Sequence, residues 1–187
     1  MPDSEEQELN CKIVVGTVSI NSVDDFLSVL REIARKYAVT IQAMDAGLIA
    51  GGEHITSAVK KAIRAVSKNQ SITSDLGLEI LLYAAGKRQI ERALAMGVTE
   101  GDKKVAIVIV DARGEKDLEL VAEEVKRKTG LKEESIRELE LDVEHNEHKR
   151  DKLKKFFAIT EEELNAVGEQ KLKMLVLERV ALLDVLK

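Results

Sequence analysis

The sequence VAIVIV at residues 105–110 is an unbroken aliphatic run in which every residue but one is β-branched. A run without polar alternation predicts a strand that is buried on both faces of its sheet. The chain has 187 residues, which is long enough for one domain with a hydrophobic core of its own. We therefore expect the segments on either side of this run to supply the rest of a sheet and the helices that cover it.

Several segments before the run show the periodicity of strands and helices. Residues 12–20 (KIVVGTVSI) and 39–44 read as strands because β-branched residues dominate them. Apolar residues at helical spacing predict four helices. These run from Asn21 or Ser22 to about Tyr37, from about Glu53 to Lys68, from Asp75 to Ala85 with a stop at Gly86, and from Lys87 to Met96 with a stop at Gly97.

The segments after the run continue the interleaving of helices and strands. They comprise a helix at residues 117–128, a half-exposed strand at 136–143 (IRELELDV), a helix at 145–157, a capping box at Thr160–Glu163 and a final helix at 171–186. This order predicts an α/β (α+β) fold: a single domain with a small mixed β-sheet flanked by several helices. We expect residues 1–10 to be an acidic, flexible N-terminus and residues 11–187 to form the domain.

Composition restricts the class of protein. Aromatic residues make up 3% of the chain and Trp is absent, so aliphatic side chains must build the core. The single cysteine, Cys11, excludes an internal disulfide and fits a reducing compartment. There is no run of eighteen apolar residues, and the N-terminus is acidic rather than basic and apolar. We expect a cytoplasmic protein.

The predicted helix at residues 53–68 carries an unusual charge pattern. Its apolar residues gather on one side, and Lys60, Lys61, Arg64 and Lys68 gather on the other with no acid among them. Like charges one turn apart repel, so folding does not require this arrangement. It is either an ordinary solvated face or a surface for phosphate groups. The net charge of −5 argues against general nucleic-acid binding but allows a local basic surface.

Two neighbouring segments favour the phosphate interpretation. The turn at residues 71–75 leads into a helix N-terminus whose N–H groups suit an anion, and Gly77 would allow close approach to the backbone. Ile72 and Leu76 could pack under a base or could be ordinary core residues. Lys87, Arg88 and Gln89 stand together at a predicted helix start, where positive charge opposes the helix dipole.

Specific stretches of this sequence resemble a known family. GLEILLYAAGKRQIERALAMGV at 77–98, IQAMDAGLIAGGEHITSAVKKAIRA at 41–65 and ERVALLDVLK at 178–187 are similar to the archaeal-type kinase-binding subunit of the KEOPS complex, the Cgi/TPRKB family. The resemblance implies a subunit without catalytic residues or cofactors that binds a small atypical kinase and the 3′ CCA end of tRNA during threonylcarbamoyladenosine synthesis. It implies indirect partners as well, a metal-dependent threonylcarbamoyl-transferase and a small dimerising subunit.

The resemblance suggests which residues bind RNA. We assign this role to Lys60, Lys61, Arg64, Lys68, Ile72, Leu76, Gly77, Lys87, Arg88 and Gln89. His54, at the head of the basic helix, is a cap, a surface residue or a further RNA contact. The alternative is a pure protein–protein scaffold whose basic face binds no RNA.

The final helix is apolar on two sides. Its second stripe, nearly opposite the broader one, comprises Met174, Leu177, Ala181 and Val185. A helix that is apolar on two sides is buried twice or faces a partner, so we assign this stripe to the kinase. Arg179 lies on the broader apolar side and should have an acidic partner or extend to solvent. His145 and His148 share a helix face, but no third metal ligand is evident.

Overall fold

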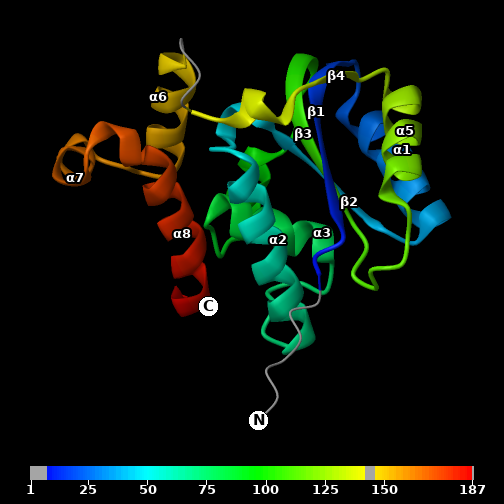
Figure 1. Cartoon of the computed structure of the whole chain (residues 1–187), viewed down its shortest axis with the longest axis horizontal. Coiled ribbons are helices and arrows are strands. Elements are labelled where there is room, and N and C mark those ends of the chain that lie inside the picture. The colour runs from blue at the N-terminus through cyan, green and yellow to red at the C-terminus, as the bar shows by residue number, and fades with distance from the viewer. Residues whose placement is uncertain (1–7, 142–145, 187) are drawn as a thin grey trace.

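The computed structural model describes residues 8–141 and 146–186, and its central element is strand β3 (Gly101–Val110). β3 pairs along its whole length with β1 (Cys11–Ile20) and on its other edge with β2 (Thr40–Asp45). A short strand, β4 (Lys132–Glu134), pairs with the outer edge of β1. The order across the sheet is β2-β3-β1-β4, and Figure 1 labels the four strands.

The expected mixed sheet is replaced by one in which every described pair of neighbours is antiparallel. β1 and β2 both run antiparallel to β3, so they run parallel to each other and are joined by helix α1 (Val23–Tyr37). The interleaving in the sequence arises from this β1-α1-β2 unit. Because β3 is inserted between its two strands, no parallel pair is in contact. The α/β class and the single domain are confirmed.

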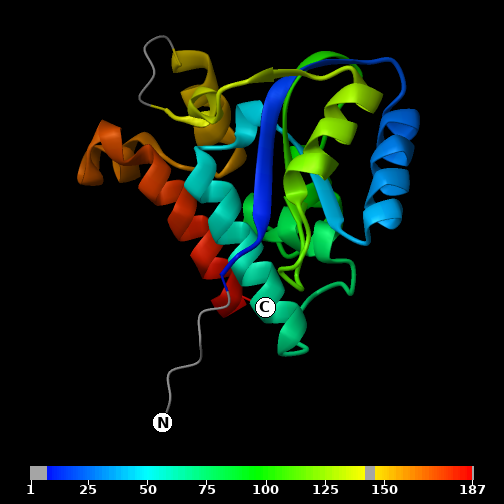
Figure 2. The same ribbon diagram turned by 45° about the vertical axis from the view of Figure 1, so that its right-hand side comes forward.

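Helices cover both faces of the sheet, and the side chains of β3 alternate between them. Val105, Ile107 and Ile109 point to the face covered by α1 and α5 (Leu118–Thr129). Ala106, Val108 and Val110 point to the face covered by α2 (Gly52–Ser67) and α3 (Leu76–Ala85). All six are buried, which confirms the strand predicted from VAIVIV. Figure 2 shows the two layers on opposite sides of the sheet.

A third group of helices packs on the outside of α2 and α3. It consists of α6 (Glu147–Phe156), α7 (Glu161–Val167) and α8 (Leu172–Leu186). Leu153 of α6, Leu164 of α7 and Val176 of α8 are fully buried in the same cluster as α2 and α3. The domain therefore has one core on each face of its sheet, and the α2–α3 core extends out to α8.

Two predicted elements are wrong in position. The strand predicted at 136–143 lies earlier, at Lys132–Glu134, and Ile136–Leu139 form a 3₁₀ helix capped by Ser135. Among residues 136–141 only Leu139 is fully buried. This fits a 3₁₀ helix, which has three residues per turn and so points one residue in three toward the core. The part of this prediction at residues 142 and 143 falls outside the described residues.

The helix predicted at 87–96 is reduced to α4 (Ile90–Ala93) and a 3₁₀ turn at Leu94–Met96. Gly86 ends α3 in a left-handed conformation, and the Lys87 N–H donates to Leu82 O in a Schellman pattern. Residues 87–89 are therefore a connecting segment and not a helix start. The local cost against the helix dipole that we expected at Lys87 does not arise.

The chain ends also differ from expectation. Residues 1–7 of the expected flexible N-terminus lie outside the described residues. Asn10 is held by its side chain, which donates to Lys116 O at 3.1 Å, and by its carbonyl, which accepts from Asp111 N at 3.0 Å. At Thr160 the hydroxyl caps Glu163 N, as expected, although the Glu163 carboxylate points to Arg179 instead of back to the cap.

His54 joins the layers on the α2–α3 side and is a structural residue. It is fully buried, its Nδ1 accepts from Ala50 N at 3.0 Å, and its Nε2 lies 2.8 Å from Ala84 O. Because Nδ1 accepts, Nε2 must carry the proton and donate to Ala84. Burial lowers the pKa of His54 to about 4. The imidazole is neutral and enclosed, which excludes the expected surface or RNA-contact role.

The buried His54 predicts a pH dependence of stability. Its pKa is about 4 in the folded protein and near 6.5 when unfolded, so its contribution is present above pH 6.5 and is lost as the pH falls. Between pH 7 and pH 5 the free energy of unfolding should fall by about 2 kcal/mol more in the wild type than in His54→Gln. Urea unfolding at both pH values measures this. His148→Gln, on an exposed residue, should behave as the wild type does.

Candidate functional site

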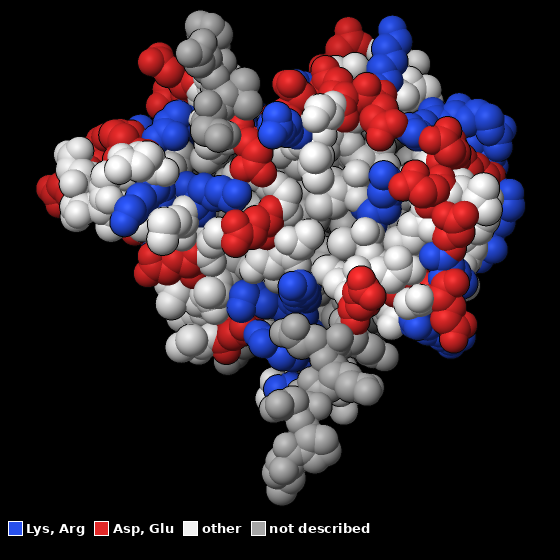
Figure 3. Space-filling model, in the orientation of Figure 1, with Lys and Arg blue, Asp and Glu red and all other residues white. Residues whose placement is uncertain are grey.

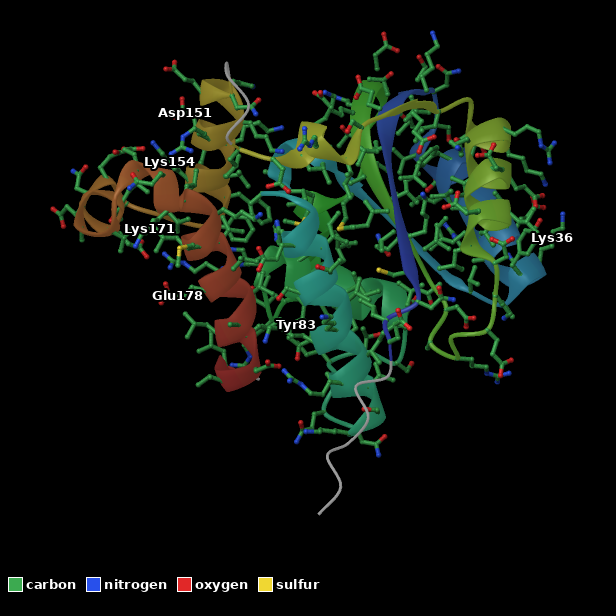
Figure 4. The ribbon with its side chains drawn as sticks, viewed as in Figure 1. Lys36, Tyr83, Asp151, Lys154, Lys171 and Glu178 are labelled. Atoms are coloured by element: carbon green, nitrogen blue, oxygen red, sulfur yellow. The ribbon has the colours of Figure 1, made fainter. Side chains whose placement is uncertain are left out.

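Helix α8 is buried on one side and exposes an apolar stripe on the other. Met174 is 59% exposed and Val185 is 78% exposed, while Ala181 is exposed and Leu177 is partly so. The opposite side packs into the core through Leu172, Leu175, Val176, Val180 and Leu183. All four residues assigned to the kinase thus lie on the accessible side. Figure 4 shows Glu178, which lies on this side among them, pointing away from the body.

Arg179 fixes α8 to its neighbours. Its guanidinium donates two hydrogen bonds to the Glu163 carboxylate, at 2.7 and 2.8 Å, and its Nε donates to Phe157 O at 3.4 Å. This confirms the expected acidic partner. The hydrogen bond from Arg179 holds the pKa of Glu163 below its usual range. Both side chains are partly buried, and the two parallel hydrogen bonds between them hold α7 against α8.

The basic face of α2 is neutralised in part by α8. Asp184 Oδ2 accepts from Lys61 Nζ at 3.3 Å and from Arg64 Nη2 at 3.1 Å. Lys60 and Lys68 are exposed and form no ion pair with any residue that the structure describes. Figure 3 shows Lys and Arg side chains gathered over the C-terminal half of α2.

A pocket of about 520 Å³ opens where α2, α3 and α8 meet. It is lined by Arg64, Ala65, Gln70, Tyr83 and Asp184. The Tyr83 hydroxyl, at the buried end, donates to Asp184 Oδ1 at 2.5 Å. Burial raises the pKa of Asp184, but the hydrogen bonds from Tyr83 and Lys61 outweigh burial and leave the pKa below its ordinary value. Asp184 is therefore a carboxylate anion that three side chains hold in place.

The turn before α3 is held by the protein's own carboxylates. Glu79 is fully buried and accepts from Ile72 N and Thr73 N, and Asp75 caps Leu78 N at 3.1 Å. The helix N-terminus that we expected to bind a phosphate thus already has an anionic cap. Ile72 itself is 38% exposed and lies at the surface.

Gly77 and Leu76 have structural surroundings. A Cβ on Gly77 would lie 3.0 Å from Gln42 Oε1, so its small size allows α3 to approach β2. Leu76 is half-buried against the core. The close approach that we expected at Gly77 therefore occurs, but toward a strand of the same chain.

Lys87, Arg88 and Gln89 lie at the other end of α3 from this turn. A helix of ten residues is about 15 Å long, so these three residues are separated from the turn and form a second group. Lys87 donates to Phe156 O at 3.3 Å, and its Nζ lies 5.3 Å from the centre of that ring. Burial, followed by the charges of Arg92 and Arg179, lowers the pKa of Lys87. Arg88 and Gln89 are exposed.

The ten residues assigned to RNA therefore form two groups. Three residues of the pocket, Gln70, Tyr83 and Asp184, were not predicted as site residues. Gln70 follows the basic helix directly, so its position was available from the sequence. Tyr83 is one of two side chains with a polar group in the apolar helix α3, beside Glu79, and Asp184 is a lone acid near the end of α8. Both were signals of a buried contact, but only the packing of α8 on α2 and α3 brings these residues together.

Other residues considered for chemistry have simpler surroundings. Within residues 8–141 and 146–186 no three His, Cys, Asp or Glu side chains are placed to hold a metal ion. His148 is exposed, and His145 lies outside the described residues. Cys11 is half-buried, and burial raises the pKa of its thiol. None of the described helices is long and apolar enough to cross a membrane.

Comparisons with known proteins identify the family. The family model described as "Kinase binding protein CGI-121" matches residues 20–184, which is most of the chain. The chain therefore belongs to this family of kinase-binding proteins, in agreement with the resemblance found from the sequence. The search of curated proteins found no match.

The Glu79 contacts lead to a prediction about the turn that carries Ile72. Glu79→Ala removes the acceptor of two backbone N–H groups and should lower the free energy of unfolding by about 2 to 3 kcal/mol. Hydrogen exchange at the Ile72 and Thr73 amides should accelerate by more than the decrease in the free energy of unfolding predicts. Glu91→Ala, on an exposed residue, is the control. Unchanged exchange at these amides in Glu79→Ala would show that another group holds the turn.

Proposed function

We propose that this chain is a non-catalytic accessory subunit of the KEOPS complex, which binds and regulates the small kinase subunit and binds the 3′ CCA end of tRNA. It thereby supports N6-threonylcarbamoyladenosine modification, in the cytoplasm. One observation carries the proposal: a chain that belongs to a kinase-binding family exposes an apolar stripe on the outer side of its last helix.

The stripe is suited to bind a folded partner because α8 is already fixed. The Arg179–Glu163 pair and the Tyr83–Asp184 hydrogen bond hold the helix at its middle and at its end. Its inner side is anchored by buried residues from Leu172 to Leu183. A partner that packs on a preordered helix does not have to order it, which favours affinity. We assign this surface to the N-lobe of the kinase. A rigid helix that packs on the N-lobe can regulate the kinase.

The kinase surface can be tested with exposed residues that do not support the fold. Met174→Glu and Val185→Glu each place a charge on the stripe and should weaken kinase binding at least about tenfold. Isothermal titration calorimetry with the purified kinase subunit measures this. Leu120→Glu is the matched control, because Leu120 is 62% exposed and lies on α5, across the sheet.

Each variant must keep the melting temperature of the wild type, since all three residues are exposed. If both α8 variants bind the kinase as Leu120→Glu does, the kinase does not bind to the stripe.

RNA binding is supported by the cations that the chain leaves unpaired. Lys60 and Lys68 on α2, and Arg88 beyond α3, are exposed and without an ion pair among the residues that the structure describes. Ile72, two residues after Gln70 of the pocket lining, is exposed as well. Unpaired cations that bind phosphates gain affinity by releasing counterions from the RNA. A single-stranded RNA end has no paired strand beside it, so each of its phosphates can contact one of these cations separately.

A salt titration tests RNA binding. For a few phosphate contacts, log affinity for tRNA should fall against log salt with a slope of about −2 to −4. Lys60→Ala/Lys68→Ala should weaken binding and make the slope shallower by roughly 1.4, since each single-strand contact contributes about 0.7. Lys132→Ala/Arg137→Ala removes the same charge from an exposed segment around β4 and should have little effect.

tRNA that lacks its CCA end distinguishes the proposal from its alternative. Loss of the end should remove most of the affinity of the wild type. Equal binding of the shortened tRNA, or no binding of either, favours a pure protein–protein scaffold. The pairing of Lys61 and Arg64 with Asp184 is the observation that supports this alternative. In both cases the transferase and the dimerising subunit are indirect partners, reached through the kinase.

A further inference from the structure

Asp184 of α8 pairs with two cations of the basic face of α2. Its Oδ2 lies 3.3 Å from Lys61 Nζ and 3.1 Å from Arg64 Nη2, within hydrogen-bonding distance of both. Lys61 and Arg64 lie almost one turn apart on α2, and two cations so spaced can share one anionic oxygen. The side chain of Lys61 is only 20% exposed and that of Asp184 is 34% exposed, so this contact is partly shielded from solvent.

The carboxylate is fixed by more than these two charges. Tyr83, from α3, donates to the other oxygen of Asp184 at 2.5 Å. α8 therefore meets two helices that lie about a hundred residues earlier in the chain, α2 and α3, at this one group. The arrangement lines the pocket of about 520 Å³ and leaves open space beside the carboxylate, together with the exposed guanidinium of Arg64.

We propose that Asp184 is a built-in competitor for the phosphate of bound RNA: it occupies Lys61 and Arg64 in the free protein and must give them up when RNA binds. This inference rests on the proposed RNA binding and adds its regulation. An anion that binds in the pocket would compete with Asp184 for Arg64, which lines the pocket, and displacement of the carboxylate would free Lys61 as well. The carboxylate lowers the affinity for any RNA that uses these donors, and it selects against weakly bound anions.

The position of Asp184 also links the two proposed surfaces. The residue precedes Val185, the most exposed member of the apolar stripe, and the two side chains leave α8 in different directions. Asp184 is part of the attachment of the α8 C-terminal end to α2 and α3. Displacement of this carboxylate by RNA would act on the same turn of helix that we assign to the kinase.

Asp184→Asn tests the competition with little change in shape. The amide still accepts from Tyr83 but no longer neutralises the two cations. Affinity for a tRNA transcript, measured by fluorescence anisotropy at about 0.1 M salt, should rise about three- to fivefold. The salt slope should steepen by about 0.7, for one more single-strand phosphate contact.

Glu178→Gln is the matched control, because it removes the same charge from the exposed side of the same helix. Its effect should be well under twofold, since salt screens charges beyond about 10 Å at this concentration. In a Lys61→Ala/Arg64→Ala background Asp184→Asn should tighten binding no more than Glu178→Gln does. Tyr83→Phe, which keeps every charge but releases Asp184 from its hydroxyl partner, should tighten binding by a smaller factor than Asp184→Asn.

The outcomes separate this inference from the proposed function. If the wild type and all variants fail to bind the transcript, the proposed RNA binding is wrong and the competition falls with it. If the wild type binds and neither Asp184→Asn nor Tyr83→Phe binds more tightly than Glu178→Gln, only the competition is wrong. Tightening by Asp184→Asn that persists without Lys61 and Arg64 would also overturn it, because the effect would then not act through those cations.

Discussion

The burial of β3 on both faces is the constraint on which the rest of the structure depends. A strand with aliphatic residues pointing to either side needs a layer of helices on each, and this chain supplies α1 and α5 on one face and α2 and α3 on the other. Such burial stabilises by about 25 cal/mol per Å² of apolar surface removed from water. Because β3 is inserted between β1 and β2, its pairing also fixes the direction of every strand beside it.

This arrangement determines where the functional surfaces lie. α2 and α3 have one side on the sheet, so only their outer sides remain for α8, which packs there through a single row of buried residues. Since α8 is an outer layer, its far side has no further element of the described chain to cover it. The apolar stripe is thus a consequence of the order of the layers, combined with a sequence that places mostly apolar residues on that side, with Glu178 among them.

The same packing brings charges together that lie far apart in the chain. Asp184 reaches α2 only because α8 lies along that helix, and the pairs it makes with Lys61 and Arg64 join residues more than a hundred positions apart. His54 shows the same effect in the core, where a residue at the head of α2 bonds to the last turn of α3. In both cases a polar group that is ambiguous in the sequence acquires one defined role from its tertiary neighbours.

The sequence by itself determined the strand at 105–110, most helix ends and the two-sided character of the last helix, because local periodicity and capping residues depend on near neighbours. It also identified the family through the stretch 77–98. It could not determine that β3 separates β1 from β2, that residues 132–134 rather than 136–143 form the edge strand, or that Lys87 and Lys60 lie in different groups. Only the tertiary structure decided these points, and above all which cations Asp184 neutralises, because they depend on contacts between segments that local sequence patterns do not relate.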